Sequence, residues 1–121
     1  NALLEEPFTV GFLTSPAPNA GVIARRLPDQ AHRIPLVLRE RAGRVLEVAA
    51  AYGYRRLVLG AWGCGVFRCD PAQVAEAFRG HLLSGGAFEG RFATVVFAVL
   101  DRRAGSPTRT AFAEVFGGGR A

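Results

Sequence analysis

A glycine-rich loop between an apolar strand and a helix constrains the fold of this chain more than any other feature. The apolar run Leu57–Leu59 reads as a buried strand, and Asp70 followed by Pro71 suits the N-cap and first turn of a helix. The glycines between them are Gly60, Gly63 and Gly65. A loop that leaves the carboxyl end of a buried strand and enters a helix is typical of α/β proteins, and it is where their sheets bind ligands.

Strands and helices alternate along the rest of the chain. We expect strands at Phe8–Leu13, Leu57–Leu59 and Phe92–Leu100, because these runs are apolar and contain β-branched residues. The expected helices are Pro35–Gly53, one that starts at Asp70 and stops near Ser84, and a short one after Ser106 and Pro107. This order predicts a parallel or mostly parallel sheet with helices on both faces.

The composition is that of one globular domain. Half of the 121 residues are hydrophobic, and no apolar run approaches the ~20 residues that a membrane-spanning helix needs. The first residues lack the basic stretch and apolar core of a secretory signal. The two cysteines, Cys64 and Cys69, are too few for a disulfide scaffold, so we expect a reduced, cytoplasmic protein with no membrane partner.

The formal net charge of +5 is carried by arginine alone, because the chain has no lysine. An arginine excess can form an anion-binding surface for nucleic acid. These arginines are scattered, however, and a GC-rich genome also produces an excess of Ala, Gly and Arg. We therefore favour compositional bias and expect no direct DNA binding.

The chain begins at Asn1 and contains no methionine. We therefore expect it to be a processed or truncated piece of a longer protein. A sheet of three strands would also have exposed edges, which suggests further strands upstream.

The loop itself has the composition of an anion cradle. Glycines let the backbone turn sharply and approach a ligand closely, so the N–H groups of Gly63–Phe67 could wrap a diphosphate. The helix N-terminus after Asp70 would add to the attraction, and Phe67 could pack against a sugar. The loop is neither a Walker loop nor a dinucleotide fingerprint, because the lysine of the first and the third glycine of the second are missing. A tight turn that needs glycine only for its geometry is the alternative.

Other candidate sites are weaker. Cys64 could be an activated thiol, but the sequence places neither His32 nor His81 beside it. Cys64 and Cys69 would form only half of a zinc site. We therefore predict no metal and no cofactor, and we interpret Trp62 as packing under the loop.

Several motifs together resemble one protein family. They are the proline-rich segment Thr14–Asn19, the string Leu57–Phe67 with its Gly-Ala-Trp-Gly-Cys-Gly-Val-Phe, the pair Asp70-Pro71, and the strand Val95–Asp101. In this order the chain, from about Leu4 to Phe116, is similar to the microbial-type poly(ADP-ribose) glycohydrolases, which are macrodomain proteins. The resemblance implies a three-layer α/β/α macrodomain with a mixed, mostly parallel sheet, of which residues 1–121 would be the C-terminal part.

The resemblance also implies a ligand, ADP-ribose or poly(ADP-ribose), and residues that bind it. The residues that match the family's diphosphate loop are Gly63, Cys64, Gly65, Val66 and Phe67. Phe67 would lie near the distal ribose, whereas Leu100 and Asp101 would lie towards the adenosine. Cys69 departs from the Asn that the family usually has before its Asp-Pro pair.

The catalytic signature of the family, a triple-glycine loop followed by Gln-Glu-Glu, does not occur in this sequence. In the family a Glu of that signature is the acid that assists glycosidic cleavage. Gly117–Gly119 has no Gln-Glu-Glu after it. We therefore expect no catalytic residue in this chain, and the protein's own N-terminal half as a partner if the two are separate. A non-catalytic ADP-ribose reader and an unrelated nucleotide-binding or phosphate-binding protein are the alternatives.

Overall fold

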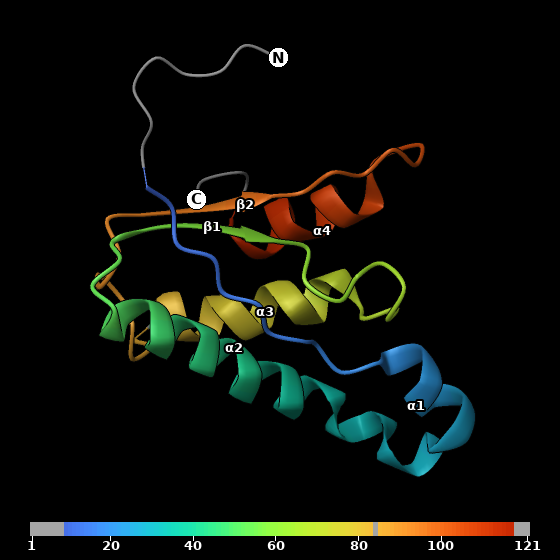
Figure 1. Ribbon diagram of the computed structural model, residues 1–121. Helices are drawn as coiled ribbons and strands as arrows, with labels where there is room; N and C mark the ends of the chain where they lie inside the picture. Colours follow the sequence, from blue (N-terminus) through green and yellow to red (C-terminus); the bar gives the residue numbers. More distant parts are fainter. Residues whose placement is uncertain (1–8, 84, 118–121) are drawn as a thin grey trace.

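The computed structural model describes residues 9–83 and 85–117, and it shows a small α/β domain (Figure 1). Its elements, in chain order, are α1 (Ala20–Arg26), the 3-10 helix η1 (Pro28–Arg33), α2 (Ile34–Ala51), β1 (Arg56–Gly60), α3 (Pro71–Leu82), β2 (Thr94–Ala98) and α4 (Pro107–Val115). The predicted helices after Pro35, Asp70 and Ser106 are confirmed, whereas α1 and η1 lie in a stretch for which the sequence predicted no element. No helix in the described part of the chain is long and apolar enough to cross a bilayer.

The sheet consists of two strands in the described residues. Strands β1 and β2 pair in parallel, with Arg56 opposite Thr94 and Gly60 opposite Ala98. The predicted parallel pairing is therefore confirmed, although β2 is shorter than the predicted Phe92–Leu100. The predicted strand at Phe8–Leu13 is wrong for residues 9–13, which form no strand, while Phe8 lies outside the described residues. A strand needs a neighbour for its hydrogen bonds, and residues 9–13 have none among the residues that the structure describes.

The helices cover one face of this sheet. The ring of Phe97 in β2 lies 5.8 Å from that of Phe78 in α3 and 5.4 Å from that of Phe112 in α4, so α3 and α4 share that face. Helix α2 packs against α3, as Figure 1 also shows. The other face carries Val58 and Val96, which are 74% and 47% exposed. The described residues thus supply helices for one of the two faces that the sequence predicts to be covered.

The core lies between α2, α3 and the sheet. Leu38, Ala42 and Leu46 form the buried stripe of α2, and Val74 and Phe78 do the same for α3. These positions follow the helical period that the sequence shows. Removing a side chain as large as Phe78 from water contributes about 1.5–3 kcal/mol to folding. This core fixes β1 and α3, and so both ends of the glycine loop.

Candidate functional site

The glycine loop leaves the carboxyl end of β1 and is closed by its own backbone. The N–H of Cys64 donates to the carbonyl of Ala61 at 3.1 Å, and the N–H of Arg68 donates to the carbonyl of Gly65 at 3.0 Å. The N–H of Cys69 then donates to the carbonyl of Gly63 at 2.9 Å. These bonds form two consecutive turns that place Gly65–Phe67 at the tip.

Three consecutive amide groups at this tip have no partner. Within the part of the chain that the structure describes, the N–H groups of Gly65, Val66 and Phe67 meet no acceptor at hydrogen-bonding distance. Gly65 and Val66 are exposed, so their N–H groups are not buried and orphaned. Successive free N–H groups in a turn form a concave anion site. The candidate anion site is therefore shorter than the predicted Gly63–Phe67. It consists of the N–H groups of Gly65–Phe67, because the N–H of Cys64 is already bonded within the loop.

The glycines of the loop have different functions. A Cβ on Gly63 would lie 2.6 Å from the Cβ of Ala17 and 2.9 Å from the Sγ of Cys69, and its φ of +73° also favours glycine. A Cβ on Gly65 would meet nothing within 4 Å, and its φ lies outside the left-handed region. The fold therefore requires glycine at Gly63, whereas at Gly65 the absence of a side chain leaves open space beside the free amides.

The proline-rich segment that carries part of the family resemblance lies directly against this loop. The indole Nε1 of Trp62 donates to the carbonyl of Ser15 at 2.7 Å, and the thiol of Cys69 donates to the carbonyl of Pro18 at 3.2 Å. The N–H of Gly21 donates to the carbonyl of Phe67 at 3.0 Å. Sequence reasoning did not bring these two segments together, because nothing in their spacing indicates a contact.

Trp62 packs under the loop, as predicted. Its ring meets that of Phe78 edge to face at 5.8 Å, so the loop rests on the core of α3. The loop geometry is therefore coupled to the packing beneath it.

The start of α3, which the sequence predicts to attract an anion, is capped by a side chain of the chain itself. The carboxylate of Asp70 accepts a hydrogen bond from the N–H of Ala72 at 2.9 Å, and Pro71 has no N–H to offer. Asp70 therefore satisfies the first turn with its own negative charge. The Asp70 carboxylate therefore weakens the attraction of this helix end for a ligand anion, whereas the N–H groups at the loop tip face no such charge of their own turn.

Cys64 does not have the environment of a nucleophile. Burial, followed by the nearby Cys69 and Asp70, raises the pKa of its thiol to about 11. Burial also raises the pKa of the Cys69 thiol above its usual value. Both thiols are therefore protonated at neutral pH, and a thiol is a much weaker nucleophile than a thiolate. No cluster of metal-ligating side chains occurs within residues 9–83 and 85–117.

The two residues expected on the adenosine side differ from each other. Leu100 is 80% exposed just beyond β2 and is free to contact a ligand. The side chain of Asp101 is 4% exposed, and its two oxygens accept bonds from Nε and Nη2 of Arg103 at 3.1 and 3.3 Å. The N–H of Thr108 also donates to Asp101, at 2.7 Å. Asp101 thus satisfies the first turn of α4, in place of Ser106, whose side chain makes no capping bond.

We predict that Asp101→Asn destabilises α4 in a pH-dependent way. The Arg103 guanidinium, together with the N–H of Thr108, holds the pKa of Asp101 well below its usual range. A carboxylate with a lowered folded-state pKa stabilises the fold above its unfolded-state pKa of about 4, and this stabilisation is lost as the pH falls further. Denaturant unfolding should therefore show that the variant is less stable than the parent protein at pH 7. The difference between their free energies of unfolding should shrink as the pH falls below about 4. A gap that stays constant with pH would contradict this role.

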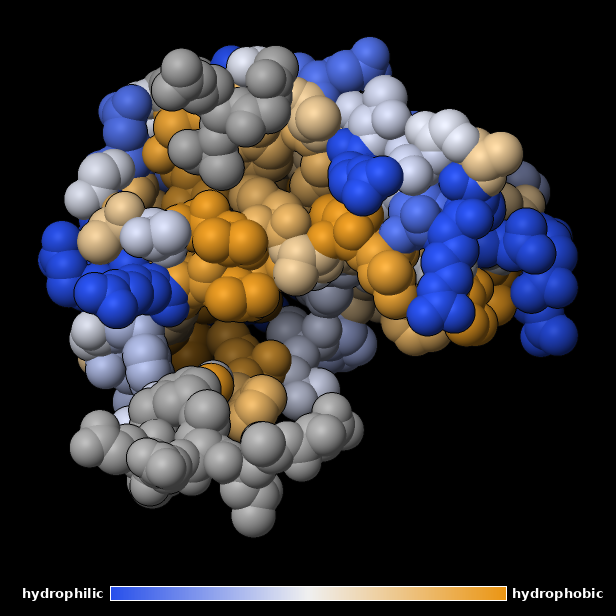
Figure 2. Space-filling view, turned by 90° about the horizontal axis from the view of Figure 1, so that it is seen from above, coloured by the Kyte–Doolittle hydropathy of each residue, from blue (hydrophilic) through white to orange (hydrophobic). Residues whose placement is uncertain are grey.

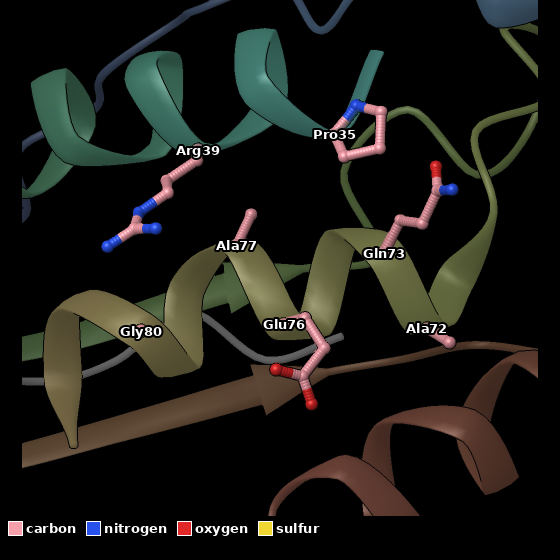
Figure 3. A pocket seen from close by; sticks show the side chains of 7 residues that line it. All are labelled: Pro35, Arg39, Ala72, Gln73, Glu76, Ala77 and Gly80. Atoms are coloured by element: carbon pink, nitrogen blue, oxygen red, sulfur yellow. The ribbon is translucent and has the colours of Figure 1, made fainter. Parts of the chain in front are cut away.

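Two hollows of the described surface lie away from the tip of the loop. A groove of about 390 Å³ runs between α2 and α3, and Figure 3 shows Pro35 and Arg39 on one side of it and Gln73, Ala77 and Gly80 among the residues on the other. A second hollow of about 290 Å³ is lined by Ser15, Pro16, Arg41 and Arg44. None of the predicted site residues lines either of them. The loop presents its amides on an open surface.

Fold and loop together define a small α/β protein whose candidate ligand site lies at the carboxyl edge of a parallel sheet. Comparison with known proteins narrows this class. No protein-family model and no curated protein matches the chain. Among solved structures, the poly(ADP-ribose) glycohydrolase of Thermomonospora curvata is 60% identical with a TM-score of 0.86, and the match covers 94% of this chain and 41% of that one.

Glycohydrolase structures from a second organism match with similar TM-scores. The enzyme of Deinococcus radiodurans in complex with ADP-ribose is 50% identical with a TM-score of 0.87, covering 95% of this chain and 46% of that one. Its apo form is 51% identical with a TM-score of 0.85, over 94% of this chain and 46% of that one. The chain belongs to the bacterial poly(ADP-ribose) glycohydrolase family, and it spans less than half the length of these relatives.

Proposed function

We propose that this chain holds the diphosphate and the distal ribose of ADP-ribose, and that the whole protein hydrolyses the ribose–ribose bonds of poly(ADP-ribose). The observation that carries the proposal is the row of free N–H groups at Gly65–Phe67, on an exposed loop at the carboxyl edge of the sheet. The similarity to a glycohydrolase that was crystallised with ADP-ribose supports it.

In this proposal the loop acts through its backbone. The amides of Gly65, Val66 and Phe67 donate to diphosphate oxygens, and such charge-assisted bonds are stronger than neutral ones. Cys64 contributes the turn and not its thiol. The carbonyl of Phe67 accepts the N–H of Gly21, which anchors the backbone at the end of the tip. The half-buried ring of Phe67 would pack against the apolar face of the ribose. Leu100 offers an apolar surface on the adenosine side, and Asp101 supports α4.

The acid for glycosidic cleavage is assigned to no residue of this chain. A general acid needs a carboxyl group that can hold a proton near neutral pH. Asp70 caps α3, and Asp101 is bound to Arg103, which favours its charged form. The proposed acid therefore belongs to the Gln-Glu-Glu segment that the family resemblance implies, outside these residues.

The bare sheet face supports the proposed macrodomain architecture and the proposed partner. Figure 2 looks down on this face and shows apolar surface between hydrophilic margins. The exposed Val58 and Val96 lie on it. We propose that the N-terminal half of the protein covers this face and completes a three-layer α/β/α domain, which residues 1–121 would share as its C-terminal part. Two free thiols fit a cytoplasmic location for the whole.

A polar substitution tests whether the N-terminal half covers this face of the sheet. Val58→Asn should lower the free energy of unfolding of the full-length protein by about 1–3 kcal/mol, because it buries an amide without a partner. The same change at Val66, on the exposed loop tip, should alter it by less than about 0.5 kcal/mol. Equal, small effects at both positions would mean that the face is open to solvent.

Binding and cleavage measured on the full-length protein test the proposed function. Calorimetry should detect ADP-ribose binding, and chromatography should detect ADP-ribose released from poly(ADP-ribose). Binding without release would favour the second candidate, a non-catalytic ADP-ribose reader, which the fold also permits. Binding of other nucleotides but not of ADP-ribose would overturn both.

A further inference from the structure

A pair of arginines converges on Gly21, directly beside the glycine loop. The Nε of Arg25 donates to the carbonyl of Gly21 at 3.3 Å. The Cδ of Arg68 lies 3.1 Å from the position that a Cβ on Gly21 would take, so its stem crosses that residue. Gly21 in turn donates its N–H to the carbonyl of Phe67. Both side chains thus meet at Gly21, which is hydrogen-bonded to Phe67 at the end of the loop tip.

Among the described residues, no carboxylate pairs with either of these guanidinium groups. Within the described ranges, the ion pair formed at 4 Å or less is that of Arg103 with Asp101, and neither Arg25 nor Arg68 takes part in one. Both arginines are exposed. Exposed positive charges without a carboxylate partner attract an anion. Guanidinium groups also match the geometry of a phosphate.

The backbone of Arg68 adds an independent observation. Its φ is +59°, in the left-handed region that residues other than glycine rarely adopt. Such backbone conformations occur mostly at functional sites, where the surrounding structure holds them in place. Here the conformation places the Arg68 stem over Gly21, where the missing side chain of that glycine makes room for it.

We propose that Arg25 and Arg68 form a second phosphate subsite, which binds a phosphate of the polymer unit next to the one held by the loop. The inference rests on the proposed function. Poly(ADP-ribose) carries a diphosphate in every unit, so a chain that places one diphosphate on the loop amides must continue past the neighbouring surface. The two arginines that meet at Gly21 would then favour the polymer over the monomer.

The test compares monomer and polymer in the full-length protein. Arg25→Gln with Arg68→Gln keeps most of both stems and removes both charges. With poly(ADP-ribose) oligomers of defined length, we expect KM to rise about tenfold with kcat unchanged, and the dependence of log affinity on log salt to become shallower by roughly 1–2. The Kd of ADP-ribose in calorimetry should stay within about twofold of the parent value.

Two further variants serve as controls. Arg55→Gln with Arg56→Gln removes the same charge at the opposite end of β1, where both residues are exposed, and should leave KM unchanged. Arg25→Lys with Arg68→Lys retains the charge and should recover most of the affinity. Thermal unfolding of each variant reports whether the fold is kept.

The outcomes separate this inference from the proposed function. If the variant loses affinity for ADP-ribose and for the oligomers equally, the arginines contact the unit that the loop binds, and the polymer subsite is overturned. An unchanged KM, or an equal rise with the control pair, would also overturn it. If the parent protein binds oligomers without cleaving them, the proposed hydrolase fails, and the same comparison made by fluorescence anisotropy still decides the subsite.

Discussion

Gly65→Val should abolish the binding of ADP-ribose while the protein stays folded. A side chain at Gly65 would stand beside the free amides of Val66 and Phe67 and keep a diphosphate away from them. Each charge-assisted hydrogen bond is worth about 1.5–3 kcal/mol, so losing two of them weakens binding by roughly 100-fold or more. Calorimetry with ADP-ribose on the full-length protein measures this effect.

The neighbouring glycine provides the matched control. At Gly65 an added Cβ meets nothing within 4 Å, so the variant should keep its free energy of unfolding within about 1 kcal/mol. At Gly63 an added Cβ would collide with Ala17 and Cys69, so Gly63→Ala should lower stability by about 1–3 kcal/mol. A Gly65 variant that binds ADP-ribose normally would rule out the amide cradle.

Phe78→Ala should have the largest effect on stability. Phe78 is among the most fully buried side chains, and its ring meets Trp62 and Phe97 edge to face at 5.8 Å each. Truncating a buried Phe to Ala costs about 3–5 kcal/mol, because it removes apolar contacts and leaves a cavity. Chemical denaturation followed by circular dichroism measures the loss.

The same substitution should also disturb the site. Trp62 loses its support from α3, and with it the fixed position from which its indole donates to Ser15. We expect weaker ADP-ribose binding in the fraction that remains folded. Val66→Ala, at the exposed tip of the loop, is the control and should change stability by less than about 0.5 kcal/mol. A comparable loss for both variants would mean that Phe78 is not part of the supporting core.

Local patterns in the sequence determined the elements around the loop. The stripe of Leu38, Ala42 and Leu46 defines α2, because a helix buries every third or fourth residue. Asp70 and Pro71 define the start of α3. Asp70 supplies an acceptor for a backbone N–H of the first turn, and Pro71 has no N–H that would need a partner there. The string of glycines and the family resemblance identified the loop that the structure places at the end of β1.

Contacts between distant residues were decided only by the tertiary structure. Whether Phe8–Leu13 forms a strand depends on a neighbour for its hydrogen bonds, which no local pattern can supply. The capping of α4 by Asp101 depends on where β2 ends relative to that helix, and a serine next to a proline looks like the cap from sequence alone. The convergence of Arg25 and Arg68 on Gly21 joins residues 43 positions apart.

The glycine loop itself combines both kinds of information. Its composition indicated close approach to a ligand, since only glycine permits such turns without a side chain in the way. The structure then distinguished the roles of two of its glycines. Gly63 is required because a side chain there would collide with Ala17, whereas Gly65 leaves open space beside the free amides. Composition cannot make this distinction, because it depends on which atoms from other parts of the chain surround each Cα.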